Sequence, residues 1–328
     1  MKKIIVMLFL LSTAFLNSFA QTDFDVYIKE GIRLYDNRDY KGAVQQYIKA
    51  LKIDNKSPEA NYEIGLTYFA LRDYKKSLEH SIKVINAKSL YVDKGYMLKG
   101  SSLDLLGNSK EAINTYKSAI KDYPNNYLLY YNLALTLYNT KADKKETENA
   151  VQHALKLNPS HSSSHLLIGY LMKDQNKRVE AILALCNFLL LEPTGTRAVE
   201  AYDKLMQVLS SKAAINNEGE FAEIEQKLNV LLEGVQIDKN KSDMPFTIQK
   251  AKAFFSALLI PKDRIKGFWS LYYADFFYAL NTNSHTEAFC YYISQPTANT
   301  NMWLKQYRPK VDALLKWNTD YKRYNGDL

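Results

Sequence analysis

The sequence predicts an all-α protein, a solenoid of helical hairpins followed by a less regular helical region. Two observations support this prediction. A pattern of 34 or 35 residues recurs from residue 24 to Pro193, and each copy holds two helix-spaced sets of apolar residues joined by a short polar turn. The composition agrees, because 47% of the 328 residues are hydrophobic, 24% are charged, and 8 are Pro and 12 Gly.

Two columns of small residues mark where the helices of each copy are expected to cross. The first helix carries Gly31, Gly65, Gly100, Ala134 and Gly169. The second helix carries Ala43, Ser77, Ala112, Thr147 and Ala181, followed four residues later by Tyr47, Ser81, Tyr116, Val151 and Leu185. A small residue at a crossing lets two helix axes approach to about 8–10 Å, and larger apolar residues one turn away fill the remaining space. These columns predict five hairpins in register.

Each copy ends at a residue that interrupts a helix, which is Asn55, Ser89, Pro124, Pro159 or Pro193. With this terminator the pattern resembles the tetratricopeptide repeat, although Ser77 and Ser81 depart from the usual small and aromatic residues. The resemblance implies a right-handed superhelical solenoid in residues 21–193. Its five repeats fall at about 24–57, 58–91, 92–126, 127–161 and 162–195.

Residues 194–328 predict a divergent, aromatic-rich helical region. A helix begins at Thr196, and 221–235 and 246–260 form two more apolar or amphipathic helices. Aromatic residues surround the segment 267–280, so we expect that helix to be enclosed by others. Residues 264–295 resemble a degenerate repeat hairpin. The last helix, which Pro309 bends or begins, has the polar surface of a cap.

Residues 1–20 have the pattern of a signal peptide: two lysines, an apolar run from Ile4 to Leu16, and small residues before Gln21. The run is shorter than the ~20 apolar residues of a membrane-spanning helix. We therefore expect an exported chain that does not span the membrane and is periplasmic or, alternatively, secreted. This start resembles exported bacterial proteins, especially Bacteroidetes-like ones.

The charge pattern argues against nucleic acid as a partner. The net charge is +8, about +6 without the two lysines of the signal peptide, and no basic cluster accompanies a binding motif. Cys186 and Cys290 lie in apolar segments and are expected to be buried free thiols; the alternative is one disulfide. Because neighbours in a solenoid are close in sequence, their separation argues against a contact.

The sequence predicts no catalytic residues, no metal site and no cofactor. His161 and His165 are four residues apart, but His161 precedes the expected helix and no third ligand is near. His285 and Cys290 are five apart and point to different sides of a helix, so they do not suit a nucleophile and its base.

A binding surface is the better hypothesis. In a solenoid of hairpins the first helices line the concave side, and tyrosine offers a large contact area with a hydroxyl. The candidate positions are Tyr35, Tyr62, Phe69, Tyr131, Asn132, Tyr138 and Tyr170, with Glu63 among their polar companions. The alternative is that these rings pack between repeats. Some proteins of the family that this sequence resembles bind a peptide's C-terminal carboxylate with a clamp of Lys, Asn and Arg. That mode is not expected here, because the positions that match the clamp hold Ile32, Leu66 and Glu63.

The sequence is compatible with three functional hypotheses. The first is a non-catalytic scaffold or assembly factor that binds a protein or peptide partner in its groove, with an outer-membrane or envelope complex as a candidate. The second is a docking solenoid whose aromatic C-terminal region binds a small ligand or glycan, in which case Trp269, Tyr273 and Trp303 must be exposed. Self-assembly through a solenoid end is a third.

Overall fold

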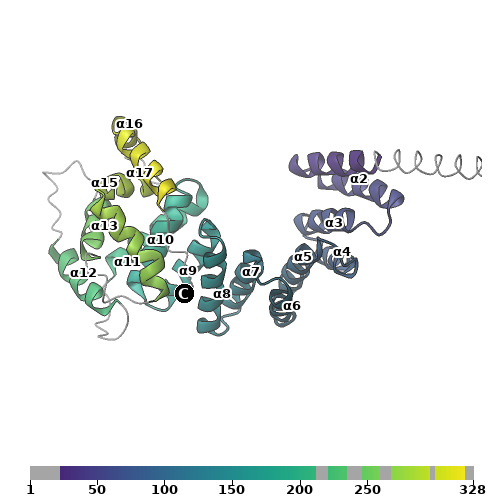
Figure 1. Ribbon diagram of the computed structural model, residues 1–328, viewed down its shortest axis with the longest axis horizontal. Coiled ribbons are helices and arrows are strands. Elements are labelled where there is room, and N and C mark those ends of the chain that lie inside the picture. Colours follow the sequence, from purple (N-terminus) through teal and green to yellow (C-terminus); the bar gives the residue numbers. More distant parts are fainter. Residues whose placement is uncertain (1–22, 212–220, 235–245, 259–266, 296–299, 322–328) are drawn as a thin grey trace, which may run out of the picture. The chain divides into compact units, whose positions relative to one another are not determined.

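The computed structural model describes residues 23–211, 221–234, 246–258, 267–295 and 300–321, and every regular element in these ranges is a helix (Figure 1). The predicted signal peptide lies outside the described residues. The chain forms two compact units, residues 1–150 and 151–328, with the division inside helix α8. The units are described one at a time.

The first unit consists of successive helical hairpins. A helix at 23–36 pairs with α2 (Tyr40–Ile53), α3 (Pro58–Ala70) with α4 (Tyr74–Asn86), and α5 (Val92–Leu105) with α6 (Ser109–Asp122). The fourth hairpin begins with α7 (Tyr127–Asn139) and continues into α8 (Lys144–Leu157). The first helices also pack on each other, α3 on α5 and α5 on α7. This alternation confirms the predicted solenoid.

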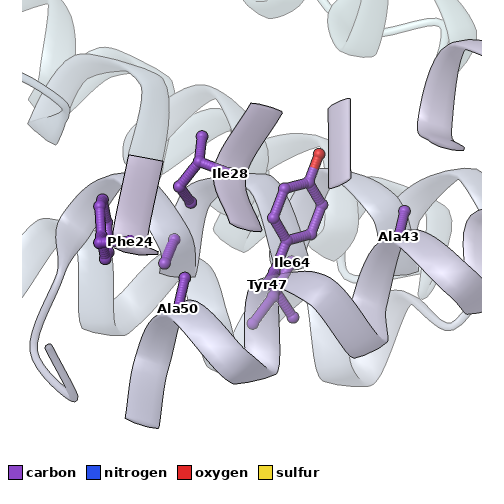
Figure 2. Close-up of a cluster of buried hydrophobic side chains, with 7 residues drawn as sticks. Phe24, Ile28, Ala43, Tyr47, Ala50 and Ile64 are labelled. Carbon is purple, nitrogen blue, oxygen red and sulfur yellow. The ribbon is translucent and has the colours of Figure 1, made fainter. Parts of the chain in front are cut away.

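The predicted crossings are observed. Ala43, Ala112 and Ala181 are completely buried, and a Cβ added to Gly31 or Gly100 would lie within 2.4 Å of the ring of Tyr47 or Tyr116. Real Cβ atoms are not found this close to a neighbour, so the glycines make room for the rings. Figure 2 shows Tyr47 among the apolar side chains that join the first two hairpins.

The turns inside the hairpins repeat one backbone conformation. Arg38, Arg72, Gly107, Lys141 and Asn176 all have positive φ values, between 53° and 84°, at intervals of 34 or 35 residues. An aspartate follows in three of these turns and caps the next helix: Asp39 accepts from the Gly42 amide, and Asp73 and Asp143 accept from equivalent amides. The helix starts are therefore set by local chemistry.

The serines that depart from the repeat pattern are accommodated by hydrogen bonds. Ser77 and Ser81 are completely buried. The Ser102 hydroxyl donates to Ser77 at 2.9 Å, and the Ser81 hydroxyl donates to the Leu78 carbonyl at 2.7 Å. Both polar groups are thus paired, as buried hydroxyls must be to avoid a desolvation cost.

The second unit is built around α10 (Arg178–Leu191). It pairs with α9 (Ser162–Asp174) as the fifth hairpin, and also contacts α11 (Thr196–Ser210), α12 (Ala222–Gly234) and α15 (Thr286–Ile293). All residues of α10 from Arg178 to Leu190 except Glu180 are buried. A helix that is apolar on all sides needs such a surround.

The aromatic segment is enclosed, as predicted. A helix starts at Phe268, passes through a π-helical turn, η2 (Ser270–Ala274), and continues as α14 (Asp275–Thr282). Trp269, Tyr273 and Phe277 are buried, and α13 (Phe246–Ala257) packs against both α14 and α15. The chain then ends its described part with α16 (Thr300–Gln306) and α17 (Arg308–Asp320), so Pro309 lies in the first turn of a new helix.

Both cysteines are free and buried, which agrees with the preferred expectation. The argument from sequence distance was wrong, however, because α10 packs against α15 and brings the two thiols near each other. Burial raises the pKa of Cys290 to about 12 and that of Cys186 well above its usual range, where Cys290 adds to the rise. Both thiols therefore stay protonated and act as small apolar side chains.

Candidate functional site

The predicted binding positions lie on first helices. Tyr35, Tyr62, Phe69, Tyr131, Asn132 and Tyr138 belong to the first unit and Tyr170 to the second, and all seven are half-buried. We call the surface formed by the first helices of the first unit, 23–36, α3, α5 and α7, the first-helix face. The structure brings some of these residues together and leaves others apart.

Tyr35 and Phe69 occupy equivalent positions and span the turn of their own hairpin. The ring of Tyr35 lies 5.3 Å from that of Tyr40, and the ring of Phe69 lies 5.3 Å from that of Tyr74. Tilted and edge-on aromatic contacts of this kind stabilise the hairpin. Both contacts lie within one repeat, so they are not the packing between repeats that was the alternative. Tyr35 also faces Tyr62 and Glu63 of the next hairpin.

Tyr62 is the centre of a group of aromatic and charged residues in the first unit. Its ring lies 5.9 Å from that of Tyr91, which immediately precedes α5. The ammonium of Lys94 lies over both rings, 5.4 Å from the centre of Tyr62 and 4.7 Å from that of Tyr91. An ammonium over two tyrosine faces is held by their negative π-surfaces.

Carboxylates complete this group. Glu59 and Glu63 are one turn apart on α3 and are both half-buried. Burial and the charge of Glu59 both raise the pKa of Tyr91. We call Tyr35, Tyr47, Glu59, Tyr62, Glu63, Tyr91 and Lys94 the tyrosine–carboxylate cluster.

Glu63 has the most unusual environment in the cluster. Burial raises its pKa, and the nearby charge of Glu59 adds to this effect while Lys94 opposes it. The hydroxyl of Tyr47 faces Glu63, but within the described chain that buried hydroxyl has no partner in hydrogen-bond geometry. Burial, with the charge of Glu63, also raises the pKa of Tyr62 to about 12.

The other predicted positions lie elsewhere. Tyr131, Asn132 and Tyr138 lie on α7, two hairpins beyond Tyr62 and Phe69. Tyr170 lies in the second unit near Glu200 of α11; burial and that carboxylate raise its pKa. The binding role of all seven positions stays a prediction.

Sequence reasoning missed Tyr91, Glu59 and Lys94. Tyr91 lies in the connection between two repeats, and Lys94 lies in the first turn of α5, so neither is at a first-helix position that the repeat register singles out. The order Tyr-x-x-Lys did offer a signal, because residues three apart meet at a helix start.

The candidate histidines are occupied by structural hydrogen bonds. The Nδ1 atom of His165 lies 2.7 Å from the Tyr273 hydroxyl, and its Nε2 atom lies 2.9 Å from the Pro159 carbonyl oxygen. Since a carbonyl only accepts, Nε2 donates and Nδ1 accepts from Tyr273. His161 pairs with Ser164 at 2.8 Å. Within the described ranges no three His, Cys, Asp or Glu side chains form a metal-binding group.

The aromatic C-terminal region does not present the rings that a sugar would need. Trp269 and Tyr273 are 5% and 0% exposed, and their rings stack on each other at 5.1 Å. Trp303 is half-buried and stacks on Tyr291 at 4.0 Å with almost parallel planes. Trp269 and Tyr273 are core residues, which counts against the ligand-binding alternative, whereas Trp303 keeps part of its surface exposed. No helix among the described residues has the length and apolar character needed to cross a bilayer.

The hairpins, their small-residue crossings and their regular spacing define an α-helical repeat protein. Residues 31–72 match a family model described as TPR repeat, and residues 97–146 match one described as tetratricopeptide repeat, so the hairpins in these two stretches are similar to tetratricopeptide repeats. The curated intraflagellar transport protein 70B of Mus musculus is 29% identical over 69 residues. That match covers 21% of this chain, and the chain spans only 10% of that protein's length.

Two solved structures share the fold. PilF of Pseudomonas aeruginosa is 21% identical with a TM-score of 0.51, and the match covers 58% of this chain and 85% of that one. PilW, described as a widely conserved type IV pilus biogenesis factor, is 15% identical with a TM-score of 0.50, covering 67% of this chain and 95% of that one. At these identities the likeness concerns the fold.

Proposed function

We propose that this chain is a non-catalytic, exported scaffold or assembly factor that binds a protein or peptide partner through its first-helix face. The observation that carries the proposal is the tyrosine–carboxylate cluster. It places half-buried tyrosines next to a carboxylate whose charge no cation neutralises at ion-pair distance within the described chain. Tyrosines beside charged groups are typical of binding surfaces, because a ring adds contact area at little entropic cost.

The family supports a binding role over a catalytic one. Tetratricopeptide hairpins are extended surfaces, each helix contacting mainly its neighbours, and they suit an extended partner better than a closed active site. PilW shows that the same fold serves in an assembly role in another protein. The groups that could do chemistry, His161, His165 and the two cysteines, are instead engaged in packing or hydrogen bonds.

Export is the second part of the proposal. It rests on residues 1–20, whose basic start, apolar run and small residues before Gln21 suit a signal peptidase. N-terminal sequencing of the chain from an envelope or periplasmic fraction should find Gln21 as the first residue. A chain that keeps Met1 and fractionates with the cytoplasm would contradict this part.

A selection from a displayed peptide library tests the binding role. Peptides that the purified chain enriches should lose binding to Tyr62→Ser and keep it with Ile82→Ser. Ile82 is 42% exposed on the second helix α4 of the same hairpin, so it is a matched surface control. Circular dichroism on both variants confirms that they fold. If no enriched peptide depends on Tyr62, the proposed surface is wrong.

A further inference from the structure

We propose that the tyrosine–carboxylate cluster is a binding site for a cationic side chain, lysine or arginine, of a basic polypeptide segment, with Glu63 as the residue that receives the charge. This inference rests on the proposed function and names the chemistry of its partner. It is the opposite of a clamp for a peptide carboxylate, since the site offers anions and aromatic faces instead of basic donors.

Glu63 has no ion-pair partner within the described chain. A half-buried carboxylate loses solvation and is stabilised only by a cation or by hydrogen bonds. Lys94 lies over the rings of Tyr62 and Tyr91, and within the described chain it forms no ion pair with Glu59 or Glu63. A cation from a ligand would form the ion pair with Glu63 that the described chain does not provide.

The buried hydroxyl of Tyr47 also favours a ligand at this site. Tyr47 is completely buried at the crossing with Gly31, and its hydroxyl has no hydrogen-bond partner in the described chain. Unpaired buried polar atoms are rare, and a specific case calls for an explanation. The hydroxyl faces Glu63, so it can donate to that carboxylate when a bound cation draws the carboxylate into hydrogen-bond geometry. Tyr116, the equivalent residue two repeats later, has its hydroxyl paired with Ser101 at 2.9 Å.

The cluster already holds one ammonium group, that of Lys94. Lys94 shows that the rings of Tyr62 and Tyr91 are placed for a cation–π contact. Lys94 itself is exposed, so an incoming lysine or arginine can share or replace its place over the rings. Arginine would add planar, two-point hydrogen bonding to the carboxylate.

The local charge of the cluster has the sign that a cationic ligand requires. The whole chain has a net charge of +8, so general attraction would favour acidic partners. The carboxylates that act on this site come from three elements: Asp36 at the end of the helix 23–36, Glu59 and Glu63 on α3, and Asp93 on α5. Against them stands Lys94 as the facing cation. An anionic site on an otherwise basic chain therefore favours a partner that carries cationic side chains.

The test compares peptides enriched by the wild-type chain with those enriched by Glu63→Gln and Glu79→Gln. Glu79 is an exposed residue on α4 and provides the same charge change in the same hairpin. Wild-type and Glu79→Gln chains should enrich lysine or arginine at one fixed peptide position, and Glu63→Gln should lose this preference. For a synthetic enriched peptide, replacing that lysine with norleucine or using Glu63→Gln should each weaken the Kd at least tenfold, and combining them should add little.

The outcomes separate this inference from the proposed function. Enriched peptides that depend on Tyr62 but carry neutral or acidic residues would overturn the cationic site and leave the binding role intact. A basic preference that survives in Glu63→Gln would also overturn it. Peptides that depend on neither Tyr62 nor Glu63 would contradict both. Thermal unfolding of Glu63→Gln should show an unchanged or higher Tm, since the variant removes a half-buried charge that has no ion pair within the described chain.

Discussion

The ring of Tyr47 occupies the place where Gly31 lacks a side chain: a Cβ at residue 31 would lie 2.3 Å from Cε1 of the ring. The two residues belong to the two helices of the first hairpin. The same relationship recurs between Gly100 and Tyr116, and in a looser form between Gly169 and Leu185. One packing solution therefore recurs in the first, third and fifth hairpins, and in the first it carries the Tyr47 hydroxyl to the tyrosine–carboxylate cluster.

Gly31→Ala should destabilise the first unit. In an exposed helix interior the same change would stabilise by about 1 kcal/mol, but here the methyl group must displace a buried ring, at a cost of about 1–3 kcal/mol. Denaturant unfolding measures the sign. Tyr47→Leu provides the control, because a Cβ added to Gly169 would lie 3.0 Å from Leu185, whereas one added to Gly31 would lie 2.3 Å from the Tyr47 ring. In the Tyr47→Leu background Gly31→Ala should therefore cost clearly less, and an equal loss in both backgrounds would contradict this explanation.

Removal of a tyrosine hydroxyl should have different effects at two equivalent positions. Tyr116→Phe should cost about 1 kcal/mol, because it breaks the hydrogen bond to Ser101. Tyr47→Phe should be neutral or slightly stabilising in the free chain, because its buried hydroxyl has no partner there. Paired denaturation curves on the two variants check this order. Equal losses at both positions would show that the Tyr47 hydroxyl is satisfied in the free chain.

Arg178 should be essential for the second unit. It is 4% exposed, and its guanidinium donates to Asn229 at 2.6 Å and to the Leu209 carbonyl at 3.2 Å, with Glu225 3.7 Å away. Arg178→Met should destabilise by about 3 kcal/mol or more, since it leaves Glu225 without its cation.

The matched double variant isolates the charge effect. Adding Glu225→Gln to Arg178→Met should recover part of the loss, because the amide oxygen can still accept from the Val179 amide that Glu225 binds at 3.0 Å. Thermal unfolding of the single and double variants gives the comparison. If the second change brings no recovery, the ion pair is not what holds α10 to α12.

Acidification should weaken the first unit through His80. Burial lowers the pKa of His80 to about 4, with Lys83 adding to the effect, and the ring pairs with Asn61 at 3.0 Å. The unfolded chain binds the proton near pH 6.5 and the folded chain near pH 4, so the contribution is full above pH 6.5 and is lost as the pH falls from 6.5 to 4. Because the ring is only partly buried, we expect roughly 1 kcal/mol or less. His80→Gln should show a flatter stability profile in this window, whereas an unchanged slope would exclude His80 as its source.

The repeat architecture could be predicted because the residues that determine each helix crossing recur at fixed intervals in the sequence. Gly31, Gly100, Ala43 and Ala112 recur at fixed intervals, and each constrains a helix crossing a few residues away. The surroundings of α10 could not be predicted in this way. Its apolar sequence shows that it is enclosed, but the helices that enclose it, α12 and α15, come from distant segments without the repeat.

Only the part of the candidate site that lies at periodic first-helix positions could be predicted from the sequence. Tyr35, Tyr62 and Glu63 lie at first-helix positions that the repeat register projects to one surface. Tyr91 lies in a connection between repeats, and its place beside Tyr62 depends on how that connection enters α5. The unpaired Tyr47 hydroxyl is a property of three-dimensional packing, and the sequence pattern carries no sign of it.

The most direct test of the account is site-specific photocrosslinking in cells. A benzophenone amino acid at Tyr62, on the first-helix face, should yield a discrete crosslinked product with one partner. The same probe at Ile82, which is exposed on α4, should yield none. Equal crosslinking from both positions, or a product from Ile82 alone, would contradict the claim that this chain binds its partner through the first-helix face.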